Sequence, residues 1–188
     1  MALPLLMIGV VVIILIIVVI FFSYYNAIVL ASNRITNAWS QIDVQLKKRA
    51  DLVPNLVETV KGYARHEKTI FTEVAKARER MLKQTDPQKK MKEANQFAAA
   101  LKSIFAIAEN YPQLRASENF KLLQEQLDGI ESKIAYSRQF YNDEVLGYNN
   151  AISTVPGIWF AKMMGRTVQM PYLETPEAER RVVKVKFE

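Results

Sequence analysis

The sequence predicts an all-α protein, in which a single N-terminal transmembrane helix precedes a bundle of long antiparallel helices and a mostly extended C-terminal tail. Three observations predict this fold. Residues 1–33 carry no Lys, Arg, Asp, Glu or His. The chain beyond them repeats apolar residues every three or four positions, which is the period of a helix. Helix-breaking residues are sparse between residues 34 and 85, where only Pro54 and Gly62 occur.

The first segment, residues 1–30, is predicted to be a transmembrane anchor. Residues 5–22 form an unbroken apolar run, and roughly 20 such residues cross about 30 Å of hydrocarbon. No basic region precedes the run and no convincing cleavage site follows it, so we expect an anchor that stays on the mature protein. Tyr24 and Tyr25 suit either an interfacial aromatic belt or the start of a helical stalk.

The charges that flank the span predict its orientation. Basic residues follow it at Arg34 and at residues 47–49 and do not precede it. Since basic flanks stay in the cytoplasm, we expect the N-terminus outside the cell membrane and the C-terminal domain in the cytoplasm. The net charge of +6 lies in the soluble part, where it is compatible with attraction to anionic membrane lipid, although charges of mixed sign favour a solvated helical face. The basic runs lack interleaved aromatic residues, so we expect no nucleic-acid partner.

Residues 31–157 are predicted to form the helical bundle, with a kink or break near residues 50–54. Pro54 would clash with the carbonyl of Ala50 inside a continuous helix. Asp51 could instead serve as an N-cap, which would place Pro54 harmlessly in a first turn. The pattern leaves open one long kinked stalk or two helices that meet there. Apolar residues repeat at helical spacing through this stretch: Ile35, Ala38, Ile42, Leu46, Val53, Leu56, Val60, Tyr63, Ile70, Val74, Ala77 and Met81.

Two further long helices are expected in the bundle. Asp86 and the proline after it predict a start for the second helix, which should end near Asn110. Ser117 should cap the third helix, whose spacing is mostly heptad-like and suits antiparallel packing at about 20°. Gly129 within it marks close helix approach or is simply tolerated. The third helix carries one apolar series: Phe120, Leu123, Leu127, Ile130, Ile134, Tyr141, Val145, Tyr148 and Ile152.

Residues 158–188 are predicted to form a short apolar helix and an extended tail. The tail ends in an alternating strand pattern, which lies over the bundle as a strap, pairs with another copy, or stays disordered. The short helix and this strand are candidate interfaces between copies, and folding back onto the same bundle is the competing interpretation for the helix. The candidate interface residues are Trp159, Phe160, Met163, Met164, Val183, Val185 and Phe187.

No pattern in the sequence predicts catalysis, a metal site or a cofactor. His66 is the only histidine and the chain has no cysteine. Metal sites in helical bundles use Glu-x-x-His pairs, but Tyr63 stands three residues before His66. The six glycines are scattered, so no phosphate-binding loop is present. We therefore expect a protein that is not an enzyme.

Several phrases of this chain resemble the LemA family of bacterial membrane proteins, and together they cover nearly its whole length. The phrases are NAWSQIDVQLKKRADLVPNLV (residues 37–57), VKGYARHE (60–67), AENYPQL (108–114), NF (119–120), RQFYN (138–142) and the earlier YN (25–26). The resemblance implies a single N-terminal span with its short terminus outside, followed by an antiparallel helical bundle. It implies no established enzymatic activity, and no catalytic role attaches to His66.

Two functions follow from these features. The first is a membrane-anchored structural or scaffold protein that self-associates and organises the membrane or its proteins. The second is a monomeric adaptor or regulator that presents its bundle to a membrane protein, such as a protease or a signalling protein. The uncharged span, the long amphipathic stalk and the terminal strand pattern favour the scaffold.

Overall fold

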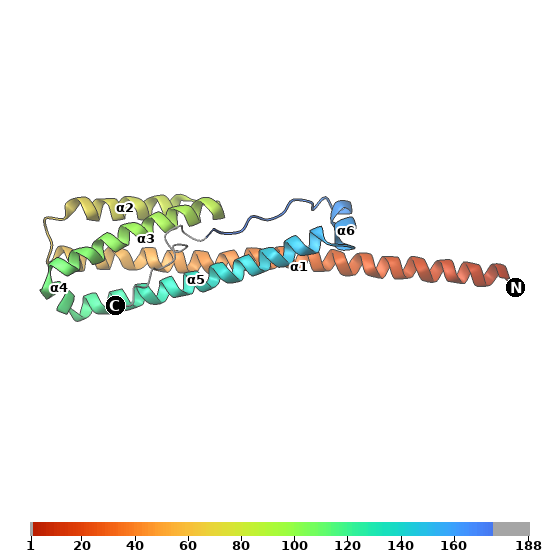
Figure 1. The fold of residues 1–188 in the computed structure, drawn as a ribbon, viewed down its shortest axis with the longest axis horizontal. Coiled ribbons are helices and arrows are strands. Elements are labelled where there is room, and N and C mark those ends of the chain that lie inside the picture. The colour runs from red at the N-terminus through yellow and green to blue at the C-terminus, as the bar shows by residue number, and fades with distance from the viewer. Residues whose placement is uncertain (1, 175–188) are drawn as a thin grey trace, which may run out of the picture. The chain divides into compact units, whose positions relative to one another are not determined.

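The structure, a computed structural model, describes residues 2–174 and is all-helical within them (Figure 1). It confirms the predicted fold class: a long apolar N-terminal helix packs against helices in an antiparallel arrangement. The helices of the described residues are α1 (Ala2–Lys61), α2 (Lys68–Lys83), α3 (Pro87–Asn110), α4 (Pro112–Ala116), α5 (Glu118–Ser153) and α6 (Gly157–Met163). Residues 166–174 follow without helix or strand.

The N-terminal part of α1 exposes its apolar side chains on every face. All side chains from Leu6 to Ile20 are exposed, and Phe21 is the first one that is partly covered. Burying apolar surface away from water is worth about 25 cal/mol per Å², so such a helix is suited to lipid. Among residues 2–174, α1 is the one helix long and apolar enough to cross a membrane. This feature indicates membrane anchoring.

The chain divides into two compact units, and α1 and α5 each contribute to both. The first unit combines residues 2–38 with Phe140–Tyr172. Its core lies between the two helices and α6, and it includes the buried rings of Tyr141 and Tyr148. The buried apolar residues of this unit are Ile28, Ile35, Ala38, Tyr141, Val145, Tyr148, Ile152 and Ala161.

The second unit is built around Trp39–Gln139 and contains the helical bundle. Its core is formed by the periodic apolar positions of the helices, as their spacing predicts. Tyr63 is an exception, because α1 ends at Lys61 and leaves this ring 43% exposed. The largest fully buried side chains of this unit are Ile42, Leu46, Val53, Leu56, Val60, Val74, Met81, Phe97, Ile104, Leu114 and Ile134.

Local signals mark where α3 and α5 begin. Asp86 caps α3 as predicted: its side chain accepts a hydrogen bond of 2.9 Å from the backbone N–H of Lys89. The long α5 starts directly after Ser117, also as predicted. The first break after the anchor, however, lies at residues 62–67 rather than at 50–54, because α1 continues through Pro54 to Lys61. The short α4 has no counterpart among the predicted helices.

Candidate functional site

Asp51 and Pro54 lie inside a continuous helix, so the interpretation of Asp51 as a helix N-cap, and that of two helices meeting near residues 50–54, are wrong. Proline has no N–H, and the carbonyl of Ala50 therefore lacks its usual donor four residues later. The structure supplies another donor: Nε of Arg78, on α2, donates a hydrogen bond of 2.7 Å to this carbonyl oxygen. The Arg78 guanidinium also lies 3.9 Å from Oδ1 of Asp51. A side chain from a neighbouring helix thus replaces the missing backbone donor.

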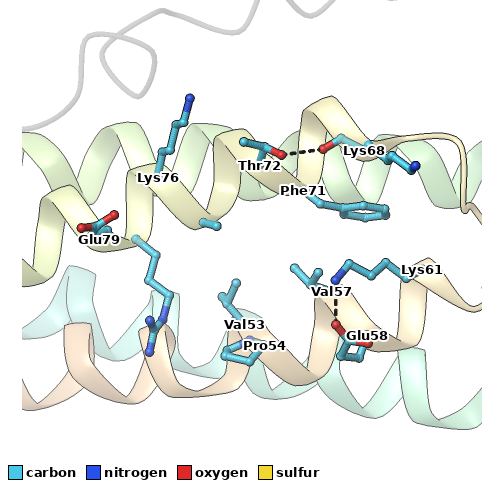
Figure 2. Close-up of a pocket in the computed structure, with 12 residues that line it drawn as sticks. Val53, Pro54, Val57, Glu58, Lys61, Lys68, Phe71, Thr72, Lys76 and Glu79 are labelled. Atoms are coloured by element: carbon cyan, nitrogen blue, oxygen red, sulfur yellow. Dashed lines mark hydrogen bonds and ion pairs between the residues drawn. The ribbon is translucent and has the colours of Figure 1, made fainter.

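This arginine lies at one wall of a groove between α1 and α2 with a volume of about 630 Å³ (Figure 2). Apolar residues of both helices contribute to its lining, among them Val53, Val57 and Phe71. The charged lining residues are four cations and two acids: Lys61, Lys68, Lys76, Arg78, Glu58 and Glu79. Lys61 and Glu58 pair with each other at 2.7 Å, as Figure 2 shows. The groove is therefore apolar with an excess of positive charge, a combination suited to an acidic amphipathic segment.

Arg49 is a buried cation in the second unit, in contrast to the exposed Lys47 and Lys48 beside it. Its guanidinium forms an ion pair with Glu131 of α5. Burial, and secondarily the nearby Arg138, lower the pKa of Arg49 to about 10. The side chain still carries its charge at neutral pH, so the ion pair provides a counter-charge that ties α1 to α5. The basic run at residues 47–49 is thus partly structural.

A second groove, of about 600 Å³, lies between α1 and α5. We call it the α1–α5 groove. It is lined by Lys48, Asp51, Leu52, Leu122, Glu125, Gln126, Gly129, Ile130 and Lys133. Leu122 is 54% exposed there, and a Cβ added to Gly129 would meet no atom within 4 Å. The groove thus combines an exposed leucine, an open glycine and two charges of each sign, which makes it electrically balanced.

The structure separates the four predicted interface residues of the short apolar helix. Phe160 folds back onto α1: its ring stacks on Tyr24 at 5.1 Å between centroids and meets Phe21 edge-on at 6.0 Å. Met164 is half-buried. Trp159 and Met163, which are four residues apart and therefore share one face of α6, remain 58% and 73% exposed. Only these two are available as an outward apolar surface.

Two glycines fix the ends of α6. A Cβ at Gly157 would lie 2.1 Å from the carbonyl oxygen of Ala151, so only glycine permits this close approach to the end of α5. Gly165 has a φ of +67°, the left-handed conformation that commonly ends helices. Gly157 thus permits the close approach of α6 to α5, and Gly165 ends the helix.

One polar side chain of α5 binds the segment that follows α6. The amide of Asn149, on α5, donates a hydrogen bond of 3.0 Å to the Met170 carbonyl and accepts one of 2.8 Å from the Met170 N–H. Asn149 is only 5% exposed, so both bonds are shielded from water. The other predicted interface residues, Val183, Val185 and Phe187, lie outside the described residues.

No catalytic arrangement is built from the predicted candidates. His66 is exposed in the turn between α1 and α2, beside the half-buried Glu67. Glu58, at the end of α1, pairs with Lys61. Within residues 2–174, no three His, Cys, Asp or Glu side chains gather as a metal site would require. The absence of enzymatic activity stays a prediction.

Three polar residues of these sites escaped the sequence reasoning. Arg78 could have been sought, because an intrahelical proline leaves a carbonyl four residues earlier in need of a donor. Arg49 and Asn149 lie three or four residues from buried apolar positions on the same helix. This spacing could have indicated that both side chains are buried.

Comparison with known proteins relates the chain to one family. The model of the LemA family matches residues 38–187. The chain is 25% identical over 167 residues to magnetosome protein MamQ of Magnetospirillum gryphiswaldense, a match that covers 75% of this chain and 61% of that protein. It is also 23% identical over 185 residues to magnetosome proteins MamQ 1 and MamQ 2 of Paramagnetospirillum magneticum, covering 85% of this chain and 68% of each relative. The chain thus spans about three-fifths of the length of the first of these relatives.

Proposed function

The chain belongs to the LemA family, and from this premise we propose that it is a membrane-anchored helical scaffold that self-associates at the cytoplasmic membrane and catalyses no reaction. Anchoring is supported by the exposed apolar face that surrounds α1 from Leu6 to Ile20. The proposal places the N-terminus outside the cell and the bundle in the cytoplasm, since Arg34, Lys47 and Lys48 follow the span. Protease added to intact cells should leave the bundle uncut, and digestion without permeabilisation would reverse this topology.

The observation that carries self-association is the composition of the α1–α5 groove. Scaffolds of identical subunits commonly use a surface that is complementary to itself. This groove offers two cations, Lys48 and Lys133, and two acids, Asp51 and Glu125, around the exposed Leu122. A second copy placed by a two-fold axis would bring opposite charges together over an apolar centre. Because Gly129 has no side chain, a helix of the second copy could approach α5 closely at this position.

Substitutions at Gly129 test this surface without removing any contact inside the chain. Gly129→Ala adds one methyl group to open space and should raise helix stability by about 1 kcal/mol. Gly129→Trp should fill the groove and weaken association at least about tenfold, which corresponds to ~1.4 kcal/mol. Energy transfer between differently labelled copies of the full chain in liposomes measures the association, and chemical denaturation followed by circular dichroism measures the stability.

The two Gly129 variants also show which result would contradict the use of this groove for association. If Gly129→Trp is as helical as Gly129→Ala and energy transfer between copies is unchanged, the α1–α5 groove is not the association surface. If the unsubstituted protein shows no energy transfer at any density in the liposome, the scaffold proposal itself fails.

The groove between α1 and α2 favours a second candidate function, that of an adaptor for a membrane protein. Its apolar lining and cationic excess suit an acidic, amphipathic segment of such a partner. Lys68→Glu together with Lys76→Glu would reverse the charge at two lining positions. Loss of a co-purifying membrane protein from native membranes on this double substitution, with energy transfer between copies unaffected, would support the adaptor function over the scaffold.

A further inference from the structure

The position of α6 along α1 places it at the edge of the membrane. The apolar run at residues 5–22 is about 27 Å long at 1.5 Å per residue, close to the thickness of a hydrocarbon core. Phe160 of α6 contacts Phe21 and Tyr24, the ring at the end of this run and the ring just beyond it. Figure 1 shows α6 beside α1 where the exposed part of the helix gives way to the packed part. The aromatic contacts therefore hold α6 at the level of the lipid headgroups.

The outward surface of α6 is apolar and carries a tryptophan. Trp159 and Met163 are exposed by 58% and 73%, and Val155 just before the helix by 69%. Tryptophan concentrates at membrane interfaces, where its ring contacts acyl chains and its N–H remains hydrated. This apolar surface lies beside a transmembrane span, where insertion of its side chains into lipid is favourable.

The charges around α6 complement an anionic lipid surface. From Thr154 to Leu173 the chain carries Lys162 and Arg166 and no Asp or Glu. A basic residue close to an anionic membrane surface is attracted to it. Lys162 is exposed and Arg166 is half-buried, with its backbone N–H bonded to the Ala161 carbonyl at 2.9 Å. Both cations lie at or just after the C-terminal end of α6.

We propose that α6 is an interfacial helix, whose Trp159 and Met163 insert into the lipid leaflet next to the bundle while Lys162 and Arg166 contact lipid phosphates. A second copy of the chain is a poorer occupant. Stable protein interfaces bury about 1,200–2,000 Å² in total, and a tryptophan buries only about 150–250 Å², so three exposed side chains supply too little area. Lipid needs no such area, because the transmembrane helix already holds the surface against the membrane.

This inference adds a second membrane contact to the anchor. A single helix leaves a soluble domain free to rotate and tilt about its exit point. A second, interfacial contact fixed to α1 by Phe160 and to α5 by the close approach at Gly157 would set the orientation of the first unit against the membrane plane. The contact is independent of the proposed scaffold function, since it requires no second copy.

The two tryptophans of the chain, the half-buried Trp39 and the exposed Trp159, can be observed one at a time. Trp39→Phe leaves Trp159 as the sole tryptophan, which is excited selectively at wavelengths where tyrosine does not absorb. Trp159→Phe leaves Trp39, which is about 25 Å farther along α1 than the end of the apolar run. Each full-length variant is reconstituted in phosphatidylglycerol-containing vesicles. Its emission is quenched in turn by lipids labelled near the headgroup, by lipids labelled at the chain end, and by acrylamide in the water.

Trp159 is expected to emit at shorter wavelength than Trp39, to be quenched most by the headgroup-proximal label, and to be protected from acrylamide. Lys162→Glu combined with Arg166→Glu should partly reverse the blue shift of Trp159 in anionic vesicles. In phosphatidylcholine vesicles the same double substitution should change the emission of Trp159 less. Circular dichroism of each variant checks that the helices remain formed. The pattern should not depend on protein density.

Two results would overturn the proposal. Emission of Trp159 that is quenched by acrylamide as readily as that of Trp39, and not by lipid labels, would place the ring in water. Protection of Trp159 that appears only at high protein density in the vesicle would show that a second copy covers the face instead. The second outcome would not affect the membrane anchor, but it would make the exposed face of α6 part of the interface between copies.

Discussion

At the scale of single residues, two polar side chains of the bundle each provide the partner that a buried polar group would otherwise lack. Pro54 removes a backbone donor from α1, and Arg78 donates to the carbonyl that is left, at 2.7 Å. Arg49 is a charge buried among apolar side chains, and Glu131 supplies its counter-charge. Leaving a buried donor or acceptor without its partner costs about 1–3 kcal/mol. These residues therefore stabilise the bundle by preventing a penalty.

The pairing of Pro54 with Arg78 predicts coupled effects on stability. Arg78→Met should lower the free energy of unfolding by about 1–3 kcal/mol, because the Ala50 carbonyl loses its donor. In a Pro54→Ala background the backbone N–H is restored, so the same arginine substitution should cost clearly less. Chemical denaturation of the four full-length proteins in detergent, followed by circular dichroism, measures both costs. Equal costs in the two backgrounds would mean that Arg78 does not act through this carbonyl.

At the scale of helices and segments, features that depend on neighbouring residues could be predicted from the sequence, whereas contacts between helices could not. Asp86 and the proline after it specify the start of α3 by themselves, since a cap needs only neighbouring residues. The continuity of α1 through Pro54 could not be predicted in the same way, because it involves a donor from α2. Local reasoning therefore left open a kink or a break near residues 50–54, whereas helix α1 continues through them and ends at Lys61, just before Gly62.

The segment after α6 gives a prediction at this scale. Asn149→Leu removes both hydrogen bonds to Met170 and should release the segment, so that trypsin cuts faster after Arg166. The bundle should stay folded, because Asn149 and Met170 both belong to the first unit and the bundle lies in the second. Asn150→Leu is the matched control, since Asn150 is exposed. Equal cleavage rates for the two variants would show that the Asn149 amide does not hold the segment.

At the scale of the whole molecule, the sequence predicted the architecture better than the surfaces. An uncharged apolar run and a helical period are properties of long stretches, so the anchor and the all-α fold followed from them. The interface prediction grouped Trp159, Phe160, Met163 and Met164 by composition alone. Their positions on α6 divide them, because one face packs on Phe21 and Tyr24 while the other is exposed. The α1–α5 groove needed the helix packing itself to be recognised.

Self-association of an anchored chain is the central claim, and the mass of the particle in its native lipid tests it most directly. The full-length protein is extracted with its surrounding membrane in polymer nanodiscs and its mass is measured over a range of dilutions. The particles should contain several copies of this chain, and those of Gly129→Trp should be smaller than those of Gly129→Ala. A single copy per particle at every dilution, alone or with a different membrane protein, would contradict it.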